Sequence, residues 1–346
     1  MKKILSILAI SLAFLLAACQ STQKYSFTAN WTADGRYQEQ TEILEYTVTH
    51  KKESIRFPSE NGSVYGGTEN ENCEITYGPG TYTVTMETSP SLPAGVEDPR
   101  EQGSSARIYR VRTELNVPVV FLPKGDAAEE KTHDDVIVSE SYFLDENHNL
   151  QPFYSRQEVE SSAYSAEYSI YRYTAEAKYS GGTVRLTVSA EDEATMEAFH
   201  MTENTLVKEF SYQEGAVLDN GMLLFAVRGM SLSDSFTGYY NVFDASAMEL
   251  MSLSVSVKET TPVSKGWTYN DAVPGADETV QTYALSIQRY GSANTGFPKI
   301  CYYQIKSDEN TREDNRCFLV RFVNPLTITK GYLQYDLKKA TVTVNQ

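Results

Sequence analysis

Alternation of apolar and polar residues runs through most of this chain and constrains its fold more than any other feature. Residues 44–48 (LEYTV) and 82–86 (YTVTM) alternate strictly, and residues 109–115 (YRVRTEL) place apolar side chains on one face and charges on the other. Thr, Val, Ile and Tyr at a period of two are typical of half-buried strands. The sequence therefore predicts a chain built mainly from β-strands.

Short polar turns join these strands into hairpins. Residues 145–149 (DENHN) separate strands at 135–144 and 150–160, and the two glycines at 181–182 separate 164–179 from 183–189. Such turns between alternating segments indicate antiparallel pairs. Further strands are expected at 236–257, 279–290, 298–307, 315–323 and 326–344, with loops at 89–105 and 262–278.

Helical signals are sparse. The clearest segment is residues 219–229 (DNGMLLFAVRG), where Asp219 or Asn220 can cap the start and Gly229 can close the end. Its apolar residues 222–230 are suited to plug the hollow of a curved sheet. Residues 191–201 fit a helix or a strand, and the pattern does not choose between them.

The N-terminus has a different character. Lys2 and Lys3 precede an apolar run at 4–18, which is shorter than the roughly 20 residues of a spanning helix and suits the core of a secretory signal. Residues 16–19 (LAAC) resemble the lipobox of bacterial lipoproteins. The alternative is an uncleaved membrane helix with an incidental cysteine.

The lipobox resemblance implies cleavage before Cys19 and thioether-linked diacylglycerol on its sulfur, with acyl chains as the membrane anchor. Two or more chains hold a protein stably at a membrane. The expected location is the extracytoplasmic face of the cell membrane. In a host with two membranes, Gln20 rather than Asp after Cys19 favours the outer membrane.

These patterns together predict a mainly β fold, with a large curved antiparallel sheet as an open barrel, a half-barrel or two sheets, and one or two short helices. The expected divisions are a signal peptide at 1–18, a tether at 19–24, an N-terminal β region at 25–160 and a C-terminal β region at 161–346 packed with it. One or two domains fit this division.

Charge narrows the choice of partners. The chain carries 46 acidic and 30 basic residues, a formal net charge of −16. Loss of Lys2 and Lys3 with the signal makes this more negative, so we expect no nucleic acid and no anionic headgroup as a partner.

The cysteines suggest one disulfide. Cys301 and Cys317 fall in two strands joined around residues 308–310, and a tight turn centred on Glu309 would place their sulfurs opposite each other. A wider loop through Asp314 would separate them. We predict the Cys301–Cys317 pair, with Cys73 buried and unreactive.

Catalytic signatures are absent from the sequence. It contains no Gly-x-Ser-x-Gly, no His-Glu-x-x-His and no phosphate-binding glycine loop, and no metal site, cofactor or catalytic residue is expected. A calcium-loop start at 145–149 fails because Leu150 and Arg156 occupy the Gly and Glu positions.

The Arg228 side chain is expected to reach either a buried carboxylate or water, and water is the preferred interpretation.

Tyrosines crowd the hairpin at 164–189. They either stack on sugar rings or pair across strands in a half-buried sheet, and the pairing interpretation is preferred. The tyrosines concerned are Tyr164, Tyr168, Tyr171, Tyr173 and Tyr179.

Three segments of the body resemble an uncharacterised family of exported bacterial β-proteins: YFLD at 142–145 with LQPFYS at 150–155, residues 218–229, and NPL at 324–326 with GYL at 331–333. The resemblance implies an open, strongly curved sheet like that of the bacterial lipoprotein-carrier proteins, and it implies no activity.

The predicted function is a non-enzymatic binding or scaffold lipoprotein that holds an apolar or glycan ligand or a partner protein. The alternative is an extracytoplasmic carboxylate-based hydrolase of glycans, which requires two facing carboxylates, one with a raised pKa. A structural envelope role is a third option, which requires an exposed apolar patch.

Overall fold

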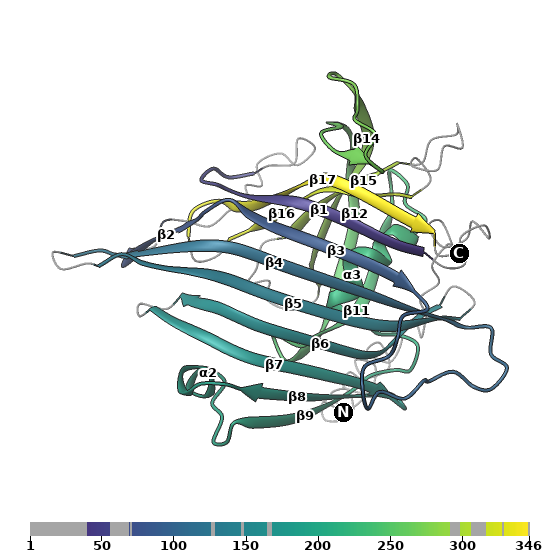
Figure 1. Ribbon diagram of the computed structural model, residues 1–346, viewed down its shortest axis with the longest axis horizontal. Coiled ribbons are helices and arrows are strands. Elements are labelled where there is room, and N and C mark those ends of the chain that lie inside the picture. Colours follow the sequence, from purple (N-terminus) through teal and green to yellow (C-terminus); the bar gives the residue numbers. More distant parts are fainter. Residues whose placement is uncertain are drawn as a thin grey trace, which may run out of the picture.

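The computed structural model describes residues 40–55, 69, 71–125, 129–146, 149–164, 168–290, 298–305, 316–326 and 329–344. These residues form one large, curved, unclosed sheet of 17 strands (Figure 1). Its pairings are antiparallel apart from two short parallel ones. The mainly β prediction is confirmed.

Neighbouring strands of the sheet are mostly consecutive along the chain. The exception is the middle of the sheet, where the first described strand lies beside the last. From one edge inward, consecutive strands are β9 (Thr205–Ser211), β8 (Thr183–Ala190), β7 (Tyr168–Ser180), β6 (Asn149–Tyr164), β5 (Lys131–Glu146), β4 (Arg107–Pro123) and β3 (Gly80–Thr88). The sheet continues through β1 (Gln40–Lys51), β17 (Tyr332–Val344), β16 (Leu319–Pro325), β15 (Lys299–Gln304), β14 (Thr279–Arg289), β12 (Glu249–Ser264), β11 (Thr237–Asp244) and β10 (Leu218–Asp219). Two short strands, β2 (Cys73–Tyr77) and β13 (Thr268–Tyr269), pair with β4 and β17.

Strand β1 connects the two halves of the sheet. It pairs with β3 on one side and with β17 on the other, so the N-terminal and C-terminal β regions share one continuous sheet. The last long strand of the chain therefore lies beside the first.

The predicted hairpins are present. Strands β5 and β6 pair in register from Val136 to Glu146, with a bulge after Tyr142, and β7 pairs with β8 through a turn in which Gly181 and Gly182 have φ of 53° and 73°. These left-handed values suit glycine because it has no Cβ. The segment at 89–105 is a loop, as expected.

The predicted loop at 262–278 is partly strand, because β12 runs on to Ser264. Pro262 lies opposite Gln281 of β14, and β11 pairs with β12 only as far as Ser256. Beyond that point one side of β12 has no paired strand among the described residues. A proline is tolerated there because the N–H that it lacks has no ladder to join.

Two short helices complete the fold. Helix α2 (Glu193–Ala198) is capped by Asp192, whose side chain accepts the Thr195 N–H at 2.8 Å, so the ambiguous segment at 191–201 contains a helix. Helix α3 (Asn220–Ala226) and the 3₁₀ turn η1 (Val227–Gly229) follow the predicted bounds, with Asp219 as the N-cap. None of the described helices has the length and apolar composition needed to cross a membrane.

Helix α3 fills the hollow of the sheet, between β4 and β5 on one side and β11 on the other (Figure 1). Met222, Leu223 and Phe225 are buried, and the Phe225 ring lies 5.7 Å from that of Phe143 on β5. The main hydrophobic core therefore lies on the concave side, around α3.

The predicted disulfide between Cys301 and Cys317 is not formed in the structure. Cys301 of β15 faces Phe322 of β16, five residues beyond Cys317, which precedes β16. At about 3.3 Å per residue, this offset is far greater than a disulfide can bridge. The connection between β15 and β16 is therefore longer than the tight turn that the pairing required.

Candidate functional site

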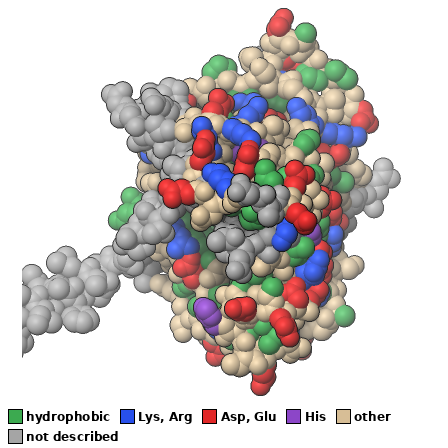
Figure 2. Space-filling view, turned by 90° about the vertical axis from the view of Figure 1, so that its left-hand side faces the viewer, with side chains coloured by type: hydrophobic (Ala, Val, Ile, Leu, Met, Phe, Trp, Pro, Cys, Tyr) green, Lys and Arg blue, Asp and Glu red, His purple; other side chains and the backbone are tan. Residues whose placement is uncertain are grey.

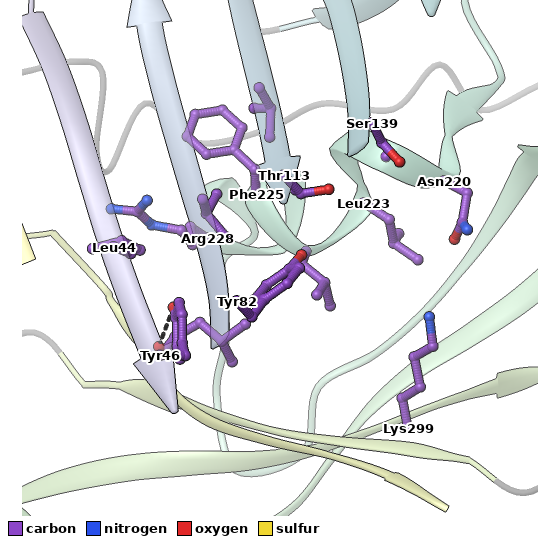
Figure 3. A pocket seen from close by; sticks show the side chains of 15 residues that line it. Leu44, Tyr46, Tyr82, Thr113, Ser139, Asn220, Leu223, Phe225, Arg228 and Lys299 are labelled. Atoms are coloured by element: carbon purple, nitrogen blue, oxygen red, sulfur yellow. Dashed lines mark hydrogen bonds between the residues drawn. The ribbon is translucent and has the colours of Figure 1, made fainter. Parts of the chain in front are cut away.

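A cavity of about 150 Å³ lies between α3 and the concave face of the sheet (Figure 3). Strands β1, β3, β4 and β5 supply one wall, α3 and η1 the other, and β15 and β16 the remaining side. Most of the lining side chains are apolar or aromatic. They are Leu44, Tyr46, Tyr82, Val84, Val111, Leu223, Leu224, Phe225 and Leu319, accompanied by Thr113, Ser139, Asn220, Gly221, Arg228 and Lys299.

The strand wall follows from sheet register. Alternate residues of a strand point to one face, and neighbours in register stand side by side on that face. Leu44 lies opposite Val84, Val84 opposite Thr113, and Thr113 opposite Ser139. One row across β1, β3, β4 and β5 thus changes from apolar at Leu44 to polar at Ser139.

The helix wall is fixed by Asp219, which is buried. Its Oδ1 accepts hydrogen bonds from Ser141 Oγ at 2.5 Å and the Gly221 N–H at 2.8 Å, and its Oδ2 accepts from Ser155 Oγ at 2.8 Å and Tyr179 OH at 2.5 Å. Burial raises the pKa of Asp219, and these four donors oppose the rise. The carboxylate therefore ties the start of α3 to β5, β6 and β7.

Two tyrosines form part of the cavity wall. Tyr46 OH donates to the Leu319 carbonyl at 2.7 Å (Figure 3), and the Tyr82 ring lies 5.8 Å from the Tyr46 ring. Burial raises the pKa of Tyr82 to about 12 and that of Tyr46 well above its usual range. Both phenols are therefore neutral around pH 7 and present ring surface to the cavity.

Behind the cavity lies a buried charge cluster, formed by Glu42 of β1, Arg228 of η1 and Arg316. Arg228 Nη1 and Nη2 donate to the two Glu42 oxygens at 2.5 and 3.1 Å, and Nε and Nη2 donate to the Arg316 carbonyl at 3.1 and 2.8 Å. Arg316 Nη1 lies 3.6 Å from Glu42 Oε2. Each of the three residues is at most 5% exposed.

The preferred prediction for Arg228, that it reaches water, is therefore wrong, and its alternative, a buried carboxylate, is correct. Burial alone would lower the pKa of Arg228, but the facing Glu42 carboxylate raises it overall. The guanidinium thus stays charged inside the protein. The Glu42 carboxylate thus faces two guanidiniums, those of Arg228 and Arg316.

Lys299 is the other charged residue that lines the cavity. It is half-buried at the start of β15, opposite Ile287 of β14, and its side chain extends toward the end of the cavity where Asn220 lies (Figure 3). Among the described residues, no carboxylate comes within 4.0 Å of its ammonium group.

A second hollow of about 50 Å³ adjoins this cavity and shares Ser139, Asn220 and Gly221 with it. It is lined by three carboxylates, Glu140, Asp219 and Asp244, of which Glu140 is paired with Arg112. Asn220 Nδ2 donates to Asp244 Oδ2 at 3.1 Å. The raised pKa of Asp219 satisfies one requirement of the hydrolase alternative, but the hollow has only about a third of the volume of a benzene-sized cavity, which is too little for a sugar ring.

A larger hollow, of about 390 Å³, is open and lined mainly by charges on strands β4, β5 and β6. Arg112 pairs with Glu140 at 2.9 Å and Arg156 with Glu158 at 2.8 Å. These charges already satisfy one another, so the hollow offers little for an added ligand to pair with.

A fourth hollow of about 220 Å³ lies where β1, β2 and β17 meet. The Tyr77 N–H donates to His50 Nδ1 at 3.3 Å, and His50 Nε2 lies 2.9 Å from the Lys330 carbonyl. Burial lowers the pKa of His50. Figure 2 shows acidic and basic side chains interspersed over this end of the molecule, where Lys52 pairs with Glu74 at 3.0 Å.

The tyrosine hairpin belongs to the core. Tyr173 and Tyr179 are buried, and Tyr173 packs edge-on against Phe199 at 4.9 Å. This agrees with the pairing interpretation for these two rings. The side chains of Tyr164 and Tyr168 lie outside the described part of the structure.

The predicted lipid-attachment and thiol residues lie in different parts of the chain. Cys19, the signal and the tether lie outside the described residues. Cys73 is buried as predicted, and burial raises the pKa of its thiol while Lys124 opposes the rise. The described residues contain no group of three or more His, Cys, Asp and Glu side chains that would hold a metal ion.

The cavity itself was not predicted as a site. Leu44, Tyr82 and Val84 were assigned to strands, but nothing local marks Thr113, Ser139 or Lys299. The sequence contains one relevant signal, the apolar helix at 219–229. A helix that packs into the hollow of a curved sheet creates an interface with that sheet, and a cavity can lie at this interface.

Comparison with known proteins adds little. No family model matches the chain, and no curated protein matches it. Among solved structures, the chain is similar to a beta-barrel-like protein of a domain of unknown function, DUF1849, from Brucella abortus. The identity is 12% and the TM-score 0.45, over 90% of this chain and 100% of that one.

Proposed function

We propose that this protein is a lipid-anchored envelope protein that binds a small apolar ligand in the cavity beneath α3, without catalysing a reaction. The observation that carries the proposal is the lining of that cavity, in which apolar and aromatic side chains from four strands and α3 converge. A concave apolar site with a few convergent polar groups is the typical form of a small-molecule site.

The size of the cavity limits the ligand. A dry apolar cavity of about 150 Å³ accepts a molecule such as benzene, and this cavity has about the same volume. The part of the ligand held inside the cavity is therefore compact: an aromatic ring or a short segment of a longer alkyl chain. Each methylene removed from water contributes about 0.8 kcal/mol to binding.

Hydrolysis receives less support than binding. A glycosidase needs a carboxylic acid that gives up its proton and a carboxylate that faces it across the substrate. Asp219 accepts four hydrogen bonds that hold the helix in place, and Asp244 accepts a hydrogen bond from Asn220. Both carboxylates thus have structural partners.

A pocket-filling substitution tests ligand binding. Val84→Phe places a ring in the cavity and is expected to abolish binding of 1-octanol, measured by NMR shifts of the Leu44, Val111 and Leu223 methyl groups. Val207→Phe is the matched control, because Val207 on the edge strand β9 is 46% exposed and does not line the cavity. Absence of methyl shifts in the unsubstituted protein would refute the proposal.

The anchor rests on the lipobox resemblance at 16–19. We expect mass spectrometry of the natively expressed protein to show a chain that begins at Cys19 and carries acyl groups. Cys19→Ala should keep its leader and lose the acyl mass. A substituted protein that is still cleaved after residue 18 would contradict lipoprotein processing.

A further inference from the structure

We propose, resting on the binding function above, that the ligand is an anionic amphiphile: a compact apolar group that carries a single carboxylate, with the carboxylate paired to the Lys299 ammonium. The proposal names a chemical class for the cavity ligand. It is carried by the arrangement of charge around an otherwise apolar site.

The cavity is lined by charge of one sign. Arg228 and Lys299 are its charged lining residues among those described, and both are cations. The nearby Glu42 carboxylate does not line the cavity and is already held by the guanidiniums of Arg228 and Arg316. A negative charge in the cavity is therefore favoured, and the low dielectric of the interior strengthens that preference.

Lys299, rather than Arg228, is the group that meets the ligand. Each nitrogen of Arg228 already donates to Glu42 or to the Arg316 carbonyl. Lys299 has no carboxylate within salt-bridge distance among the described residues, and it is half-buried rather than fully solvated. One such ammonium matches one negative charge, which is why a carboxylate is favoured over a phosphate dianion.

The two ends of the cavity differ in polarity, which sets the orientation of the ligand. Lys299 and Asn220 lie at one end of the cavity in Figure 3, and Leu44 and Tyr46 lie away from that end. The register row across the strands also becomes polar toward Ser139. A carboxylate beside Lys299 thus has its apolar part directed over Val84, Val111 and Leu223.

The test compares octanoate with 1-octanol, which share a chain length and differ in charge. With the unsubstituted protein, octanoate should bind about tenfold more tightly, because a hydrogen bond to a charged group contributes more than a neutral one. Lys299→Met should remove that tenfold difference between the two compounds, while Lys299→Arg should retain it. Affinities are measured from the methyl shifts of Val111 and Leu223.

Lys338→Met is the matched control, since Lys338 is an exposed lysine of β17 that does not line the cavity. Equal affinities for the two compounds, or octanoate binding unaffected by Lys299→Met, would overturn the carboxylate assignment while leaving the apolar site intact. Failure of both compounds to shift the methyl groups would overturn the binding function itself. The circular dichroism spectrum of the Lys299→Met protein shows whether it is folded.

Discussion

At the scale of single residues, two buried carboxylates hold the cavity wall in different ways. Asp219 is stabilised by neutral donors and the backbone, whereas Glu42 is stabilised by two guanidiniums. A buried charge is stable only when its partners compensate for the water it has lost. Removal of either carboxylate therefore leaves several buried donors without an acceptor.

Glu42→Gln tests this at the more strongly charged site. The substitution removes the carboxylate that pairs with the buried Arg228, so we expect the free energy of unfolding to fall by about 3–5 kcal/mol. Chemical denaturation followed by circular dichroism measures the change. Glu209→Gln, which removes an exposed partner of Arg185, should have little effect.

A Glu42→Gln protein as stable as the Glu209→Gln protein would contradict the prediction. It would indicate that water or a neighbouring group compensates the guanidiniums.

At the scale of secondary-structure elements, α3 is held unusually close to the sheet, and Gly221 makes this possible. A Cβ at Gly221 would lie 2.4 Å from Ser141 Oγ and 2.9 Å from Asp219 Oδ1. Both atoms are fixed by hydrogen bonds to each other, so they have little room to move.

We expect Gly221→Ala to lower the free energy of unfolding by about 1–3 kcal/mol through overpacking, and to shift the methyl resonances of the cavity as α3 moves outward. Gly266→Ala is the control, since a Cβ there meets no atom within 4 Å. Equal stability of the two substituted proteins would show that α3 adjusts freely.

Sequence patterns predicted elements better than they predicted contacts between them. The helix at 219–229, the hairpins β5–β6 and β7–β8 and the loop at 89–105 depend on local periodicity, caps and turns, and these were predicted. The continuation of β12 through Pro262 was not predicted. A proline is accepted at that position because β11 pairs with β12 only as far as Ser256, which the local sequence does not reveal.

The disulfide was predicted wrongly and the cavity was not predicted, both for the same reason. Whether Cys301 faces Cys317 depends on the register of β15 against β16, which the intervening residues do not determine. Likewise, Lys299 and Ser139 meet at one cavity although 160 residues separate them. Local sequence patterns do not determine which distant residues become neighbours in the fold, so a single sequence does not reveal them.

At the scale of the whole molecule, β1 is the strand on which both halves depend. It is placed between β3 and β17, so unpairing it would leave two sheets with new edges and open the concave core. Strands in the middle of a sheet are expected to open only with the cooperative unit that contains them, whereas edge strands open locally.

Val48→Ala tests this role. Val48 of β1 is fully buried, and its truncation should cost about 2 kcal/mol, by analogy with other large-to-small core substitutions. If β1 couples the halves, amide hydrogen exchange should accelerate by a similar factor in β4 and in β15, on opposite sides of β1. Val207→Ala on the edge strand β9 should accelerate exchange only near β8 and β9. Faster exchange in one half alone after Val48→Ala would mean that the halves unfold independently, and the continuous sheet would then not be a single cooperative unit.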